Sequence, residues 1–336
     1  MIELVCSSDS IIDGLFDECL LKDIHYHPDY LRLFEDYTND KSIYVHYKEK
    51  DNYLLIPFFI RPLANGFKDL VSPWYYGGPI SNHFYSQQMF KNFLAKFTSY
   101  CKANKIVSEF QRFNPITKNH ILYEQSSFNR KIVYVDLTQD VETINYNYER
   151  HVKKNIKKAF RSGLDIHIDN SSKGIETFKK LYTQSMTQKH AKPFYFFNDD
   201  FFDNLFNMFK DEVNLFYVEY KGKTICSSME LGKYGILHDY LRGTDSKYLE
   251  LRPNDFLLDT VINWAKQEGF KYFSLGGGNT TKEDDSQYKF KKSFSTNTAD
   301  FYVYKKIHNM EVYKQLCNGR DFEYEKAPYF PEYMEE

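Results

Sequence analysis

One order of predicted elements occurs twice along this 336-residue chain: a helix, a hairpin, a strand, a helix and a strand. In the first half, hydrophobic periodicity and turn residues predict helices over 28–36 and 85–102, a hairpin over 43–60 and a strand over 106–113. In the second half, they predict helices over 176–188, 199–209 and 254–267, a hairpin over 213–231, and strands over 235–241 and 270–275. This repeat indicates duplication of one mixed unit, and therefore an α/β fold with mixed sheets.

The length also favours two domains, because single cores rarely extend over so many residues. We expect a first domain over 1–138 and a second over 139–311. A strand, a charged helix and another strand over 134–168 would join them. The tail, 312–336, is expected to pack back on the first domain.

Composition excludes several classes of protein. Lys and Arg number 44 against 46 Asp and Glu, so the net charge gives no argument for nucleic-acid binding. The five cysteines are too far apart for a zinc ribbon or a redox pair, and no other metal-ligand spacing is present, so we expect reduced thiols and no metal site. The start of the chain has no secretory pattern and no apolar run is long enough to span a bilayer, which predicts a cytoplasmic protein.

A triple glycine, Gly276-Gly277-Gly278, follows the last predicted strand of the second half. An acidic loop comes next, and then Phe290 and Lys291. Glycines leave backbone amides accessible, and Lys291 adds positive charge, so this segment is a candidate site for an anionic or polar ligand. The alternative is a flexible turn with solvated lysines.

A basic helix is predicted over 150–161, where Val152, Ile156, Ala159 and Phe160 form an apolar stripe opposite the cations. It is interpreted as a solvated face. The alternative is a contact for a polyanion such as RNA or lipid headgroups, through residues Lys153 to Arg161.

Two further segments place polar residues at strand ends, where α/β folds bind ligands. Tyr76 and Gly77 lie in an aromatic and glycine-rich loop, and Arg112 and Asn114 end the strand over 106–113. An arginine there suits a phosphate or a carboxylate, although loop packing explains these residues equally well. In the second half, His238 and Asp239 point to opposite faces if their strand is regular, which argues against a His–Asp dyad.

Taken together, these segments resemble the FemAB-like branch of the GNAT acyltransferase superfamily, in which two GNAT-type domains occur in tandem. The resemblance covers most of the chain. It rests on the glycine loop with Phe290-Lys291, the basic helix with Asn155 followed by Gly163, the loop at 76–79 and the strand end at 112–115.

The resemblance implies an N-acyltransferase of cell-envelope biosynthesis that moves an acyl or aminoacyl group onto an amine of a nucleotide- or lipid-linked sugar precursor. The alternatives are an aminoacyl-tRNA-dependent transferase acting on a peptidoglycan precursor, with tRNA on the basic helix, and a non-catalytic binder of a nucleotide-sugar or polysaccharide. No cofactor is expected beyond acyl-CoA or aminoacyl-tRNA as co-substrate, and membrane-surface association is a further expectation.

The resemblance also implies roles for single residues. Lys291 would stabilise charge at the reacting ester or thioester, together with the glycine amides, and would hold the donor. Lys192, in the segment His190-Ala191-Lys192-Pro193, would hold the acceptor's diphosphate, with Arg32 as its partner from the first domain. Tyr240 and Arg242 would line the cleft, and Tyr240 and Asp239 are candidate catalytic residues together with Lys291.

Three positions depart from the family pattern. Asn114 replaces the aspartate of some peptidoglycan enzymes, and Leu241 replaces an aromatic residue. The segment Leu251-Arg252-Pro253-Asn254-Asp255 lacks the glycines of acetyl-CoA-binding loops, which disfavours simple acetyl-CoA binding. The alternative is that the start of the following helix, with Arg252 nearby, binds phosphates.

Overall fold

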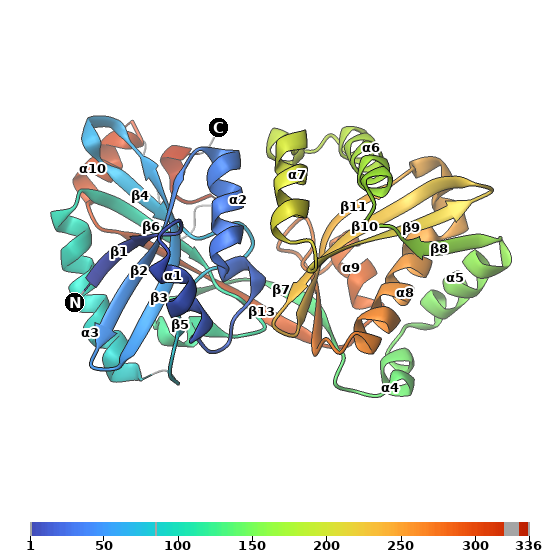
Figure 1. Ribbon diagram of the computed structural model, residues 1–336, viewed down its shortest axis with the longest axis horizontal. Helices are drawn as coiled ribbons and strands as arrows, with labels where there is room; N and C mark the ends of the chain where they lie inside the picture. Colours follow the sequence, from blue (N-terminus) through green and yellow to red (C-terminus); the bar gives the residue numbers. More distant parts are fainter. Residues whose placement is uncertain (1, 85, 319–328, 335–336) are drawn as a thin grey trace. The chain divides into compact units, whose positions relative to one another are not determined.

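The computed structural model describes residues 2–84, 86–318 and 329–334 (Figure 1). The chain forms two compact units. The first comprises the residues up to Asn129 and those from Asp300 onward, and the second comprises Arg130–Ala299. These divisions differ from the boundaries expected at 138/139 and 311/312.

The first unit is built on a mixed sheet with strand order β1-β2-β3-β4-β6-β13. All neighbours are antiparallel except β4 and β6, which are parallel, and a short β5 pairs with β3. The strands are β1 (Ile2–Cys6), β2 (Lys41–Glu49), β3 (Asn52–Pro62), β4 (Lys68–Val71), β5 (Ile80–Ser81), β6 (Ile106–Arg112) and β13 (Thr298–Ile307). The helices are α1 (Ile11–Asp17), α2 (Pro28–Thr38), α3 (Gln87–Ala103) and α10 (Met310–Leu316).

The second unit repeats this arrangement with the order β8-β9-β10-β11-β12-β7, and β11 and β12 are again the parallel pair. Its strands are β7 (Ser127–Asp136), β8 (Leu164–Ile168), β9 (Val213–Tyr220), β10 (Lys223–Lys233), β11 (Ile236–Thr244) and β12 (Tyr272–Gly276). Its helices are α4 (Val141–Tyr146), α5 (Arg150–Arg161), α6 (Ser172–Gln188), α7 (Asp199–Met208), α8 (Pro253–Gln267) and α9 (Ser286–Lys292).

The two sheets therefore share one strand order, which confirms the predicted mixed α/β fold with two related domains. The last strand of each sheet is out of sequence. β7 follows β6 along the chain but pairs with β12, and β13 follows the second unit but pairs with β6. This exchange explains the shifted boundaries, because the units divide close to the first residues of β7 and β13.

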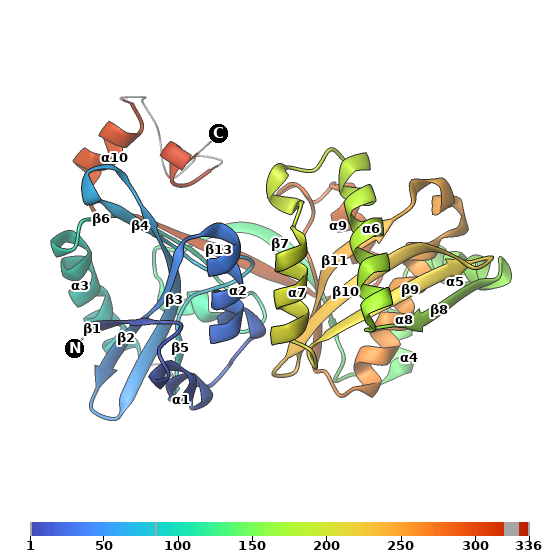
Figure 2. The same cartoon turned by 45° about the horizontal axis from the view of Figure 1, so that its top comes forward.

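Helices cover both faces of the second sheet, because successive residues of its strands contact opposite helical layers. Figure 2 shows α6 and α7 on one face and α5 and α8 on the other. Tyr217 of β9 donates its hydroxyl to the Gly174 carbonyl of α6 at 2.7 Å, whereas the neighbouring Phe216 packs against Trp264 of α8 with ring centroids 5.1 Å apart. Adjacent strand residues point to opposite faces, so one strand serves both helical layers.

The described part of the C-terminal tail belongs to the first unit. Tyr313 of α10 is buried, and the Tyr333 hydroxyl donates to Asp69 at 3.0 Å and lies 2.8 Å from the Ser108 hydroxyl. Residues 319–328, 335 and 336 of the expected tail lie outside the described residues. Among the described helices, none is both long enough and apolar enough to cross a bilayer.

Candidate active site

A split between two parallel strands is the main irregularity of the second sheet. β11 and β12 pair over only three residues, the last being His238 with Ser274. β11 then bulges at Tyr240, because Glu230 of β10 pairs with Asp239 while its neighbour Met229 pairs with Leu241. Beyond the last pair, the facing backbones of β11 and β12 do not bond to each other in this fully described region, which leaves groups that a ligand can use.

The equivalent position in the first unit is closed. The backbone N–H of Gly77 donates to the Arg112 carbonyl at 2.6 Å, and the Arg112 guanidinium donates to the Ser72 carbonyl at 2.9 Å. A Cβ at Gly77 would lie 2.6 Å from the Cβ of Ser72, and Tyr76 is buried. These three predicted site residues therefore meet, and they hold a loop against the end of β6.

Asn114 and Arg32 also make their contacts within the first unit. The Asn114 amide donates to Asp23 at 2.9 Å, and its oxygen accepts from the backbone N–H of Ile116 at 2.8 Å. The Arg32 guanidinium forms an ion pair with Asp29 at 2.5 Å. Contacts of these two residues with a substrate stay predictions.

In the second unit, the triple glycine forms a corner at the end of β12 that charged side chains hold in place. Gly276 has a φ of +74°, and Lys291 of α9 donates from Nζ to the Gly277 carbonyl at 2.9 Å. Arg130 donates to the Gly278 carbonyl at 3.0 Å. The structure thus brings Lys291 to the glycines, as the sequence suggested. Its ammonium group donates to the Gly277 carbonyl oxygen and does not lie beside an accessible backbone N–H.

Asp285 connects this glycine corner to α9. Its carboxylate accepts from the backbone N–H groups of Thr280, Gln287 and Tyr288 at 3.0, 2.9 and 3.0 Å. The first of these bonds orders the loop, and the other two cap the first turn of α9. Asp285 thereby places the helix that carries Lys291.

A side chain at Gly278 should break this arrangement. The Cβ of alanine would lie 2.4 Å from Asp285 Oδ1 and 2.6 Å from its Cγ. We expect Gly278→Ala to lower the free energy of unfolding by roughly 1–3 kcal/mol, the usual cost of overpacking, as measured by denaturant unfolding. Gly14→Ala is the control, because nothing lies within 4 Å of its Cβ. Equal stability of the two variants would contradict this account of the corner.

Burial makes Lys291 an unusual lysine. Loss of solvation lowers the pKa of its ammonium group to about 8, the charge of Asp239 raises the pKa in part, and that of Arg242 lowers it further. These three residues come from α9 and β11, so the structure brings Lys291, Asp239 and Arg242 into one charged cluster. A lysine of this kind changes its charge near neutral pH.

The bulge at Tyr240 corrects the expectation of a regular strand. Asp239 and Arg242 are three residues apart and would lie on opposite faces of a regular strand. With the bulge they share a face, and the Arg242 guanidinium donates to Asp239 at 2.9 Å. Tyr240 itself is only 4% exposed and His238 is buried, so neither presents a freely accessible surface.

Sequence reasoning missed Glu230, which belongs to this cluster. It is fully buried on β10 directly across from Asp239. Burial raises the pKa of the Glu230 carboxyl well above its ordinary value, the negative charge of Asp239 raises it further, and Arg242 opposes both. A glutamate between Met229 and Leu231 in an apolar strand was the available signal.

The remaining predicted residues lie elsewhere in the second unit. His190 and Lys192 are exposed between α6 and α7, where the short helix Pro193–Tyr195 follows them. Phe290 packs against the core beside Phe294, with ring centroids 5.4 Å apart. The structure does not join Lys192 to the Lys291 cluster by any contact among the described residues.

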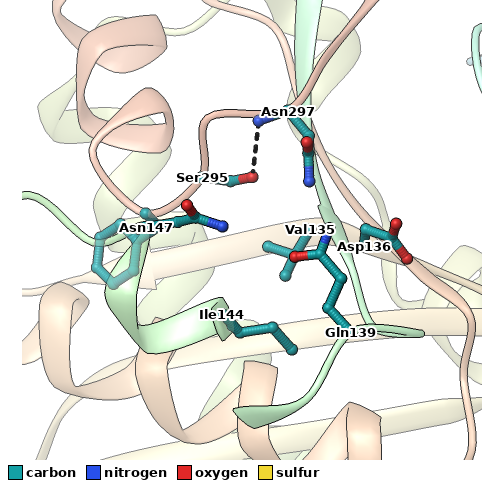
Figure 3. Close-up of a pocket in the computed structure, with 8 residues that line it drawn as sticks. Val135, Asp136, Gln139, Ile144, Asn147, Ser295 and Asn297 are labelled. Carbon is teal, nitrogen blue, oxygen red and sulfur yellow. Dashed lines mark hydrogen bonds between the residues drawn. The ribbon is translucent and has the colours of Figure 1, made fainter. Parts of the chain in front are cut away.

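A small pocket in the second unit has none of the predicted site residues in its lining. Figure 3 shows it, with Ser295 accepting a hydrogen bond from the backbone N–H of Asn297 at 3.1 Å. Its lining residues are Val135, Asp136, Gln139, Ile144, Asn147, Phe294, Ser295 and Asn297. This lining contains no cationic side chain and none of the predicted site residues, so we do not assign the site to it.

Helix α5 presents a cationic face, defined here as Arg150, Lys153, Lys154, Lys157, Lys158 and Arg161. Val152, Ile156 and Ala159 pack on the core, and Asn155 donates to Asp255 of α8 at 2.9 Å. All six cations are exposed, and none forms an ion pair with a described carboxylate. Phe160 was expected on the apolar stripe but is 72% exposed, because it lies about 100° around the helix from Ala159.

Comparison with known proteins finds a known domain in the second unit. Residues 147–291 match the acetyltransferase (GNAT) domain. Over 190 residues, the chain is 28% identical to the UDP-N-acetylmuramoylpentapeptide-lysine N(6)-alanyltransferase of Weissella viridescens. The match covers 54% of this chain and 54% of the relative, so the chain spans about half the length of the curated relative that it matches.

Solved structures resemble the chain over nearly its whole length. FemX has a TM-score of 0.67 at 11% identity, with 93% of this chain and 99% of FemX covered. L-PGS from Bacillus licheniformis has a TM-score of 0.55 at 14% identity, with 94% and 99% covered. Likeness at these identities concerns the fold. Residues 147–291 thus match the GNAT acetyltransferase domain, and the fold of the whole chain resembles that of FemX.

Proposed function

We propose that the protein is an N-acyltransferase that moves an aminoacyl group from a tRNA carrier onto an amine of a peptidoglycan precursor. The observation that carries the proposal is the open strand split beside the glycine corner, where Lys291 places positive charge. This site lies in the unit that contains the matching GNAT domain.

The reaction needs positioning and charge stabilisation and no covalent enzyme intermediate. The acceptor amine attacks the ester carbonyl of the donor, and the carbonyl oxygen becomes an oxyanion. The Lys291 ammonium stabilises that oxyanion. The ester oxygen then leaves with the electron pair of the broken C–O bond and takes a proton, while the amine loses one.

Two features of the second unit support the choice of donor class. The cationic face of α5 offers six exposed cations for a polyanion such as tRNA. By contrast, α8 begins at Pro253 with Arg252 as its N-cap and no side-chain cap, and its entry contains no glycine loop for a pyrophosphate. Both observations favour aminoacyl-tRNA over acyl-CoA.

The acceptor class rests on similarity and on Lys192. The Weissella relative is named as an alanyltransferase acting on the lysine of a UDP-linked muropeptide. Lys192 is exposed, as a residue that binds a diphosphate must be. We therefore place a muropeptide amine ahead of a sugar amine as the acceptor.

The test is a product assay with purified protein, in which alanyl-tRNA or acetyl-CoA is combined with a UDP-linked muropeptide or a UDP-amino sugar. We expect product with alanyl-tRNA and the muropeptide, and its loss when RNase is added first. Product with acetyl-CoA and the amino sugar would refute the proposed donor and acceptor. Binding of UDP-sugars without any product would support a non-catalytic protein.

The rate should depend on the charge of Lys291. With a pKa of about 8, Lys291 is charged below pH 8 and loses its charge as the pH rises through that value. The contribution of Lys291 to the rate should therefore fall about tenfold per pH unit above pH 8. Lys291→Arg keeps its charge throughout, so its single-turnover rate should lack this fall. If the single-turnover rates of the two proteins change with pH in the same way above pH 8, the charge of Lys291 does not contribute to the rate.

A further inference from the structure

Glu230 is a buried carboxyl group that the proposed chemistry does not use. Its side chain is fully shielded from solvent, and neither carboxyl oxygen makes a hydrogen bond of normal geometry with a described residue, although the Ser228 hydroxyl is close enough to favour the charged form. A buried polar group without a partner destabilises the fold by about 1–3 kcal/mol. Glu230 therefore needs an explanation outside the fold itself.

Charged side chains surround Glu230. Asp239 and Arg242 face it from β11, and Ser228 lies on the same face of β10. Lys291 of α9 is close enough to Asp239 and Arg242 for their charges to interact. The same holds for Lys189 at the end of α6. Arg242 already neutralises Asp239 through their ion pair. The cluster thus contains two carboxyl groups and three cationic side chains, and Glu230 is the carboxyl group that forms no ion pair with a described residue.

The open end of the strand split lies beside this extra carboxyl group. The ladder between β11 and β12 stops at His238, and Asp239 is the next residue of β11. Asp239 and Arg242 are partly exposed at this point, with exposed side-chain fractions of 10% and 15%. Asp239 is therefore the carboxylate next to the split, and Glu230 lies one strand further on, directly across from Asp239.

We propose that Glu230 and Asp239 form a subsite for a primary ammonium group of the substrate. Carboxylate oxygens accept hydrogen bonds only, and an ammonium group supplies three donors, so the two match in chemistry. The ammonium ion would give Glu230 the hydrogen bonds that the chain itself does not provide. A carboxylate that accepts hydrogen bonds from an ammonium ion, with the charge of Arg242 nearby, no longer requires a proton.

Binding at this subsite exchanges one proton for the ligand. Burial beside Asp239 raises the pKa of the Glu230 carboxyl well above its ordinary value and so favours its protonated form in the free protein. When the ammonium ion binds, the O–H bond of Glu230 breaks, the electron pair stays on the carboxylate and the proton goes to the buffer. Charge is balanced, because one cation enters the cluster and one proton leaves it.

Two parts of the substrate could supply the ammonium group, and this assignment rests on the proposed function. One is the α-ammonium of the aminoacyl donor, which an acyl-CoA donor lacks. The other is the acceptor amine before it loses its proton and attacks. The probes are therefore L-alanine methyl ester for the donor and Nα-acetyl-L-lysine methylamide for the acceptor, with uncharged N-acetyl-L-alanine methyl ester as the matched control.

Isothermal titration calorimetry of the full chain tests the subsite, because buffers of different ionisation enthalpy report the protons released. We expect the charged probe that fits to bind with release of close to one proton, and the uncharged ester not to bind. Preference for the alanine ester assigns the subsite to the donor, and preference for the lysine probe assigns it to the acceptor. Equal binding of the charged and uncharged alanine esters would refute the proposal.

Glu230→Gln should keep the fold, because glutamine has the same shape, and should abolish proton release. Its affinity for the charged probe should fall at least about 10-fold, the usual effect of losing a hydrogen bond to a charged group. Glu219→Gln on neighbouring β9 is the control and should bind as the wild type does. Unchanged proton release in Glu230→Gln would also refute the subsite.

These experiments separate the subsite from the proposed function. Proton-linked ammonium binding in a protein that transfers no acyl group would preserve the subsite and refute the function. Acyl transfer without such binding would preserve the function and refute the subsite.

Discussion

Replacing Lys291 with alanine should slow acyl transfer by about 10²–10³, the usual cost of removing one stabilising donor at a reacting oxygen. The physical reason is local: Lys291 lies on the Gly277 carbonyl at the end of β12, beside the open strand split. The loss should appear in the single-turnover rate with substrate saturating, because the charge acts on the oxyanion more than on the ground state.

Lys289→Ala on the same helix is the matched control. Lys289 is exposed and one residue removed from the buried face, so its loss should leave the rate within a factor of two or so of the wild type. Thermal unfolding of both variants must be near that of the wild type for the comparison to hold. A folded Lys291→Ala variant with the wild-type rate would remove Lys291 from the mechanism.

Replacing four lysines of the cationic face, Lys153, Lys154, Lys157 and Lys158, with glutamine should weaken tRNA binding by about 10²–10³ near 0.1 M salt. Each lysine that contacts a phosphate contributes about 0.7–0.9 to the slope of log affinity against log salt concentration. If all four make contact, the slope should decrease by about three. Filter binding of uncharged tRNA over a range of salt concentrations measures both quantities.

The control carries the same change of charge elsewhere, with Lys41, Lys48, Lys50 and Lys102 replaced by glutamine. All four are exposed in the first unit. Its affinity and salt slope should stay close to those of the wild type. If both quadruple variants lose affinity equally, the cationic face of α5 is not the tRNA contact and only the overall charge matters.

The repeated order of elements was readable from the sequence because it depends on local periodicity. Helices α6 and α8 and the hairpin of β9 and β10 have apolar spacings and polar turns that are visible over short windows. The strand exchange was not readable. β7 pairs with β12 and β13 with β6 across long separations in sequence, and nothing in the local pattern specifies the partner of a strand.

The candidate site divides in the same way. The triple glycine with Lys291 could be identified because both motifs are continuous segments, and Lys291 does contact Gly277. The loop around Tyr76, Gly77 and Arg112 has a similar composition, yet its polar groups are engaged within the first unit. Composition predicted two candidate loops, and only the backbone pairing separates the open one from the closed one.

The sequence by itself determined the α/β class, the duplication, the basic helix and the glycine corner, because each follows from residues close together in the chain. Only the tertiary structure decided that Glu230, Asp239, Arg242 and Lys291 form one cluster. That convergence depends on the register of β10 against β11 and on the one-residue bulge at Tyr240. A bulge changes which side chains share a face, and its position follows from pairing with a neighbouring strand and not from the local sequence.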